Sequence, residues 1–103
     1  MVIYEINLSV DRDVAEEFTK WLETEHLGEM SENEGFFESK VFYRKPQEEG
    51  LDDKKALLTV HYSVHSRKDL ERYFEDHAEV LRSKATDLFG DKFTADRRIL
   101  YKD

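Results

Sequence analysis

The chain has 103 residues and a formal net charge of −8, which arises from 16 lysines and arginines against 24 aspartates and glutamates, and it has no cysteine. This length predicts one domain, residues 1–103, and the absence of cysteine excludes disulfides, thiolate metal ligands and cysteine nucleophiles. The acidic balance predicts that neither nucleic acid nor an anionic membrane is a partner, because both are bound mainly through lysine and arginine.

Residues 2–10 alternate between apolar side chains on one face and mixed side chains on the other, which predicts a β-strand. This alternation differs from the continuous apolar run of a secretory signal. No stretch of the chain approaches the ~20 apolar residues that cross a bilayer. The expected location is therefore the cytoplasm.

Residues 11–33 change to a helical period, in which Phe18, Trp21, Leu22 and His26 recur at three- and four-residue spacing. Gly35 is predicted to mark the end of this helix, because glycine suits the left-handed position after a helix. Two further strands follow, joined by a charged loop that contains the only proline. These segments are residues 36–44, the loop 45–55 and residues 56–64.

A second helix is predicted to begin at Ser66, because Ser66 and Asp69 have the spacing of a capping box. An apolar stripe at helical spacing continues from there to Gly90, which is predicted to end the helix. The stripe consists of Leu70, Tyr73, Phe74, His77, Leu81 and Leu88. Residues 92–101 form the last predicted strand.

The element order β-α-β-β-α-β predicts the α+β class and the ferredoxin-like arrangement, a four-stranded antiparallel sheet with two helices on one face. Apolar residues occur on both faces of the predicted strands, so the face away from the helices should also be covered. A second copy of the chain is the simplest cover. We therefore expect a homodimer that pairs its sheet faces.

His26 and His77 each lie on the apolar stripe of a predicted helix, so both should face the space between helices and sheet. An imidazole in that position is a candidate catalytic acid or base. The alternative is a core histidine that only completes hydrogen bonds. Trp21 and Tyr73 on the same stripes are candidate ligand contacts or, alternatively, core aromatic residues. No metal site and no cofactor are expected, because the histidines lack a metal-binding spacing and a third ligand.

Three polar residues inside predicted strands are further candidates for ligand binding. Arg97 and Arg98 are adjacent, so one of them must point to a covered face. Such an arginine either pairs with Glu5 on the neighbouring strand or holds an anionic group of a ligand. Asn7 would face the histidines if its side of the strand met the helices, and would contact the partner subunit otherwise. The second arrangement is favoured because the opposite face is more apolar.

These segments together resemble a family of small bacterial domains of the dimeric α/β-barrel superfamily. The resemblance is carried by the opening strand VIYEINLSV, Trp21-Leu22 with His26, Gly35-Phe36, Tyr73 with His77-Ala78, and the closing FTADRRIL. It implies a ferredoxin-like protomer that dimerises sheet to sheet, distantly related to antibiotic-biosynthesis-type monooxygenases. Haem-degrading members of this superfamily use an asparagine on the first strand with a histidine and a tryptophan on the second helix. Asn7 and His77 match two of these roles, but the only tryptophan lies on the first helix, so haem degradation is not expected.

Two functions stay open from the sequence. The first is a homodimer that binds a small organic molecule and oxygenates or isomerises it without a cofactor, with His26 or His77 as the base. The second is a non-enzymatic, stress-associated or structural binding module of the same fold. A cavity of roughly 300 Å³ or more with converging polar groups would favour the enzyme, and a sealed helix–sheet layer would favour the module.

Overall fold

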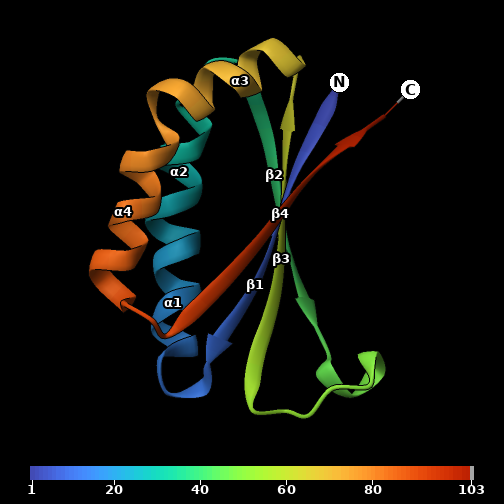
Figure 1. Ribbon diagram of the computed structural model, residues 1–103, viewed down its shortest axis with the longest axis vertical. Helices are drawn as coiled ribbons and strands as arrows, with labels where there is room; N and C mark the ends of the chain where they lie inside the picture. The colour runs from blue at the N-terminus through green and yellow to red at the C-terminus, as the bar shows by residue number, and fades with distance from the viewer. Residues whose placement is uncertain (103) are drawn as a thin grey trace.

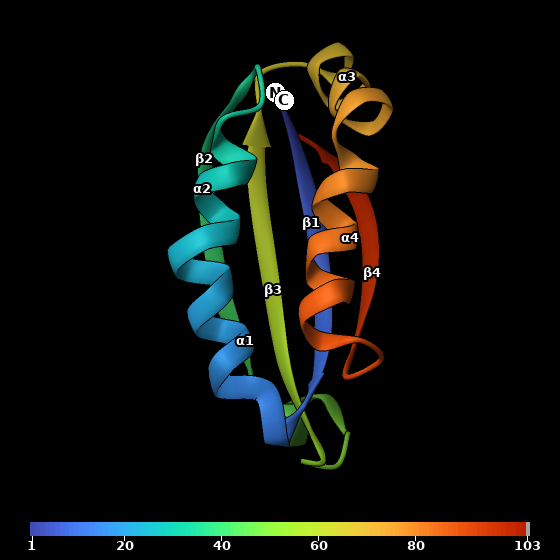
Figure 2. The same ribbon diagram turned by 90° about the vertical axis from the view of Figure 1, so that its left-hand side faces the viewer.

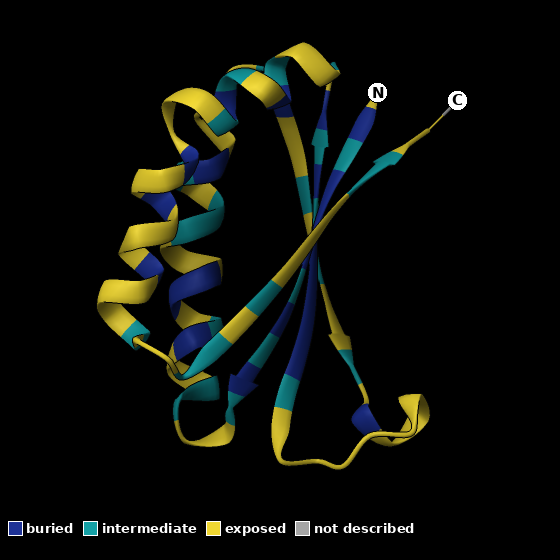
Figure 3. Ribbon diagram, viewed as in Figure 1, coloured by how far each residue is buried: buried dark blue, intermediate teal, exposed yellow. Residues whose placement is uncertain are grey.

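Four antiparallel strands form one sheet in the order β2-β3-β1-β4 (Figure 1). The structure is a computed structural model that describes residues 1–102. The bounds of the strands are Val2–Asp11 for β1, Phe36–Arg44 for β2, Lys55–Val64 for β3 and Phe93–Tyr101 for β4. The two central strands, β1 and β3, are the most buried (Figure 3). The predicted ferredoxin-like arrangement is confirmed.

Two helical segments lie on the same face of this sheet and leave the other face open (Figures 1 and 2). The α2 helix lies over the β2 side and α4 over the β4 side (Figure 2). The first segment consists of η1 (Arg12–Val14), α1 (Ala15–Trp21), the π-helical turn η2 (Leu22–His26) and α2 (Leu27–Ser31). The second consists of α3 (Arg67–Asp76) and α4 (Ala78–Phe89), and the short 3₁₀ helix η3 (Pro46–Glu49) lies in the hairpin loop.

The face of β1 that packs on the helices is the predicted apolar one. Its side chains meet those of β3 and of both helical segments in a single core. The β1 members of this core are Val2, Tyr4, Ile6, Leu8 and Val10. Among residues 1–102, no helix has the length and hydropathy needed to cross a membrane.

The second helix is not continuous, which corrects the prediction. His77 leaves the helical conformation, with φ −132° and ψ −25°, and separates α3 from α4. The break turns the chain so that Ala78 is buried and the His77 side chain is exposed. The expectation that His77 faces the space between helices and sheet is therefore wrong. The stripe was drawn through a helix break. Leu88 at its far end, in the last turn of α4, is also exposed.

Gly35 directly precedes β2 and lies in the left-handed region, with φ +87°, and a Cβ there would collide with the Asp69 side chain in the first turn of α3. We expect Gly35→Ala to lower the free energy of unfolding by about 1–3 kcal/mol. Gly28 is the matched control, because it lies in α2 with open space at the Cβ position. Gly28→Ala should raise stability by about 0.5–1 kcal/mol. Urea denaturation of both variants checks this, and equal effects would contradict it.

Candidate functional site

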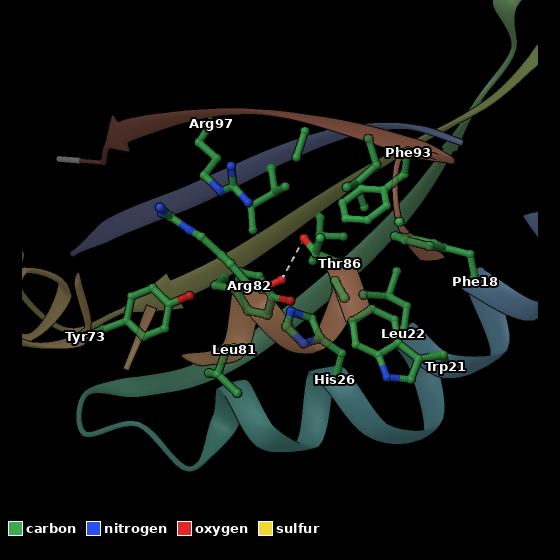
Figure 4. Close-up of a pocket in the computed structure, with 17 residues that line it drawn as sticks. Phe18, Trp21, Leu22, His26, Tyr73, Leu81, Arg82, Thr86, Phe93 and Arg97 are labelled. Carbon is green, nitrogen blue, oxygen red and sulfur yellow. Dashed lines mark hydrogen bonds between the residues drawn. The ribbon is translucent and has the colours of Figure 1, made fainter. Parts of the chain in front are cut away.

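A cavity of about 330 Å³ lies between the helices and the sheet (Figure 4). Inward-facing residues of β1, β3 and β4 form one wall, and α1, η2, α3 and α4 supply the other. Most of the lining is apolar or aromatic, and the polar side chains that reach it are His26, Tyr62, Tyr73, Arg82, Thr86 and Arg97. This composition and size fall within the range of small-molecule sites, which have volumes of roughly 300–1,000 Å³. The helix–sheet layer is therefore not sealed.

The π-helical turn η2 places His26 in this cavity. The backbone N–H of Leu27 donates to the carbonyl of Leu22, five residues earlier instead of four. The extra residue widens the turn and brings the His26 ring onto the Trp21 ring, with centroids 4.8 Å apart and an interplanar angle of 25°. Such single wide turns within α-helices occur frequently at functional sites. The predicted placement of His26 and Trp21 between helices and sheet is confirmed, whereas the wide turn was not predicted.

His26 carries a buried nitrogen without a partner. Its Nδ1 atom has no hydrogen bond within the part of the chain that the structure describes. Burial lowers the pKa of His26 to about 4; Glu29 opposes this shift, and the positive charges of Lys84 and Arg97 add to it. The ring is therefore neutral at pH 7 and able to accept a hydrogen bond or a proton, or to donate a hydrogen bond, at this nitrogen.

Tyr62 on β3 supplies a second buried polar atom without a hydrogen-bond partner among residues 1–102. This atom is the hydroxyl oxygen of Tyr62, which lines the cavity. Burial raises its pKa, and burial likewise raises the pKa of Tyr73 to about 12, so both phenols stay neutral. Leaving a buried polar group unpaired costs about 1–3 kcal/mol. Two such groups in one cavity are free to form hydrogen bonds with a molecule that enters it.

Two arginines complete the polar lining. Arg97 follows the alternation of β4 and faces the helices opposite Ile6, so it is the member of the Arg97–Arg98 pair that reaches the cavity. Arg82 comes from α4, and its Nη2 donates to the Tyr4 hydroxyl over 3.1 Å. Sequence reasoning missed Arg82 and Tyr62. The signal for Tyr62 is that it alternates with Val60 and Val64 on the apolar face of β3, where a hydroxyl needs a partner.

Asn7 and Arg98 lie on the opposite, open face of the sheet, where they surround Glu5. Asn7 Nδ2 donates to Glu5 Oε2 over 2.9 Å, His61 Nε2 donates to Glu5 Oε1 over 2.8 Å, and Arg98 Nε donates to Glu5 Oε2. Thr59 donates to Asn7 Oδ1 over 2.7 Å. The predicted pair of Glu5 with an arginine of the last strand is confirmed, with Arg98 as the partner.

The chemistry of this cluster centres on one carboxylate. Glu5 is only 4% exposed. Burial raises its pKa, but hydrogen bonds from Arg98, Asn7 and His61 outweigh burial and lower the pKa to about 2. The cluster is thus a fixed, charged centre on the open face. It does not share the cavity with His26, so neither Asn7 nor Arg98 belongs to the same site.

His77 also lies apart from the cavity, beside Glu29, Val80 and Lys84 in a surface hollow between α2 and α4. The sequence-predicted candidates therefore divide into three places. The cavity brings together His26, Trp21, Tyr73 and Arg97; the open sheet face holds Asn7 and Arg98; the helix surface holds His77.

The family model described as a domain of unknown function, DUF4286, matches residues 1–102. The chain belongs to the DUF4286 family. No curated protein matches this DUF4286 chain in sequence. Its likeness to solved structures lies in the fold. The similar structures include proteins described as antibiotic biosynthesis monooxygenases, so the distant structural relation to that type, which the sequence implied, is confirmed.

Three structures illustrate the range of this likeness. A candidate antibiotic biosynthesis monooxygenase from Nitrosomonas europaea shares 15% identity with a TM-score of 0.67, covering 99% of the DUF4286 chain and 98% of its own. SnoaB, a cofactor-independent oxygenase from Streptomyces nogalater, shares 10% sequence identity with a TM-score of 0.66. The match covers 99% of the DUF4286 chain and 93% of SnoaB. The de novo designed protein Foldit4 shares 17% sequence identity with a TM-score of 0.64. The match covers 99% of the DUF4286 chain and 98% of Foldit4. A fold common to an oxygenase and a designed protein does not by itself assign an activity.

Proposed function

We propose that this DUF4286 chain binds a small organic molecule in the helix–sheet cavity and moves a proton on it, with His26 as the base. The observation that carries this proposal is that one aromatic-lined cavity contains two buried polar atoms without a hydrogen-bond partner among residues 1–102. These are His26 Nδ1 and the Tyr62 hydroxyl. The fold that the chain shares with a cofactor-independent oxygenase is consistent with chemistry that needs only side chains.

The proposed step is a proton transfer. A neutral His26 takes a proton from a carbon next to a carbonyl group of the ligand, and the Tyr62 O–H donates a hydrogen bond to the oxygen on which negative charge develops. Return of the proton to another carbon completes an isomerisation. In the oxygenase form, molecular oxygen accepts the electrons of the carbanion, so that a methylene becomes a carbonyl and water leaves.

The low pKa of His26 makes it a weak base until negative charge develops beside it. This favours, as the second candidate, a module that binds a ligand and does not convert it. The two candidates differ in turnover and agree on binding, so one probe can separate them.

The test uses 2-tetralone, a two-ring ketone with acidic C–H groups. We expect calorimetry to detect its binding, and proton NMR in D₂O to show that the protein accelerates deuteration next to the carbonyl. His26→Gln should lower this acceleration about 100-fold or more, and Tyr62→Phe should lower it about 100-fold. Tyr62→Phe should also raise the free energy of unfolding of the ligand-free protein by about 1 kcal/mol, because it removes an unpaired buried hydroxyl. Binding without deuteration would establish the second candidate, and no binding would overturn both.

We further infer that two copies of the chain pair through the open sheet face. The side chains of that face include four basic residues, Lys40, Arg44, Lys55 and Arg98, and four acidic residues, Glu5, Asp11, Glu38 and Asp96. The face is therefore neutral on a chain of net charge −8, so that two copies can approach there without net repulsion. Exposed Phe42 adds apolar surface. The solution mass tests this and should be twice the 12.3 kDa of one chain.

A further inference from the structure

The cavity has two chemically different ends. In Figure 4, Arg82, Arg97 and Tyr73 lie toward one end, and Phe18, Trp21 and Phe93 lie toward the other. The aromatic end is tightly packed, with the Phe18 centroid 5.7 Å from that of Trp21 and 5.2 Å from that of Phe93. A ligand that fills this cavity would therefore be apolar at one end and polar at the other.

The charges at the polar end are not neutralised by any carboxylate among residues 1–102. Arg44, Arg67, Arg72 and Arg98 each form an ion pair with a carboxylate. Arg82 and Arg97 form none within residues 1–102, although the protein carries an excess of acidic residues. The only side-chain hydrogen bond of Arg82 there goes to the Tyr4 hydroxyl, not to a carboxylate.

The two guanidinium groups belong to one place in the fold. Arg82 and Arg97 line the cavity together, and both also line the smaller neighbouring hollow beside Tyr4 and Phe74. Their charges act on the same group, because both oppose the rise in the pKa of the buried Tyr73. Guanidinium groups match planar carboxylates through paired N–H donors, and such charge-assisted hydrogen bonds are stronger than neutral ones.

We propose that the ligand of this cavity is an aromatic carboxylic acid of one or two fused rings. Its carboxylate lies between Arg82 and Arg97, and its ring system lies in the cavity against the wall that Phe18, Trp21 and Phe93 form. A carbonyl or hydroxyl group on the ring then meets His26 Nδ1 and the Tyr62 hydroxyl. This inference rests on the proposed function and adds the charge and shape of the molecule that the site selects.

The experiment compares 2-naphthoate with 2-naphthamide by isothermal titration calorimetry, because the two probes share shape and differ in charge. The wild-type protein should bind the acid at least about tenfold more tightly than the amide. Arg82→Gln and Arg97→Gln should each weaken binding of the acid by about 10- to 100-fold and leave binding of the amide nearly unchanged. Arg12→Gln is the control, because Arg12 is exposed like Arg82 and Arg97 but lies outside the cavity, where it donates to the Asp53 carbonyl; this substitution should change neither affinity.

The outcomes separate this inference from the proposed function. Equal binding of acid and amide by the wild type would overturn the inference, as would loss of both probes in the arginine variants whose circular dichroism shows an intact fold. In either case binding of 2-tetralone would still support the proposed function. Failure of the acid, the amide and 2-tetralone to bind would overturn both.

Discussion

Replacing Glu5 with glutamine should lower the free energy of unfolding at pH 7 by about 2–3 kcal/mol. The Glu5 carboxylate accepts hydrogen bonds from three side chains at the centre of the open sheet face. Glutamine keeps the shape but loses the charge, and its amide group presents donors to the donors of Arg98 and His61. Urea denaturation of the wild type and the variant measures the difference. A loss below about 0.5 kcal/mol, the level of an ordinary surface substitution, would show that the cluster contributes little.

The same substitution should change how stability depends on pH. The pKa of Glu5 in the folded protein is about 2, below its ordinary value of 4.5. Its contribution is therefore fully present above pH 4.5 and is lost as the pH falls toward 2. His26 acts in a different window, because its folded pKa of about 4 lies below 6.5. The unfolded chain binds the proton first, so stability falls from pH 6.5 toward 4. Glu5→Gln should remove only the pH dependence of the free energy of unfolding between pH 4.5 and 2. His26→Gln should remove only that between pH 6.5 and 4.

Replacing Phe42 with aspartate should convert the proposed dimer into a monomer, with the mass falling to the 12.3 kDa of one chain. Phe42 on β2 is 43% exposed on the open face, and its ring lies edge-on to His61, with centroids 5.1 Å apart. Aspartate removes apolar area there and adds one negative charge per copy to a neutral face. The dimer dissociation constant should rise by about 100-fold or more, as for an apolar residue central to an interface. Sedimentation equilibrium measures this constant.

Val80→Asp is the matched control for this experiment. Val80 lies on α4, is 61% exposed and belongs to the helix side of the molecule, so the same gain of charge should leave the dimer intact. Dissociation by Val80→Asp, with a stable dimer in Phe42→Asp, would place the interface on the helices. A wild-type mass of one chain would remove the dimer altogether.

The sheet and its two faces were predictable because alternation is a local property of each strand. Tyr4, Ile6 and Leu8 had to share a face whatever their partners were, and that face was clearly the more apolar one. The predicted order of strands then placed Glu5 beside the last strand. The choice between Arg97 and Arg98 as its partner depended on the register between β1 and β4, which alternation within one strand does not determine.

The helix side was harder to predict because helical periodicity assumes an unbroken geometry. At His77 the helix breaks, and at Leu22–His26 it widens by one residue. Both departures change which side chains face inward after them. His26 kept its inward position through the wide turn, and His77 lost it at the break. Arg82 was missed because an arginine beside the apolar stripe of a helix normally extends into solvent. It lines the cavity because β4 supplies the facing wall.

The position of Trp21 gives the molecule its own optical reporter. Trp21 is the only tryptophan, and it lines the cavity with its ring stacked on His26. All indole fluorescence therefore originates at the wall of the site, in contact with the group proposed to change protonation. A protonated imidazole quenches indole emission, and an aromatic ligand nearby alters it. The light emitted by the unlabelled protein thus reports both the occupancy of the cavity and the charge of His26.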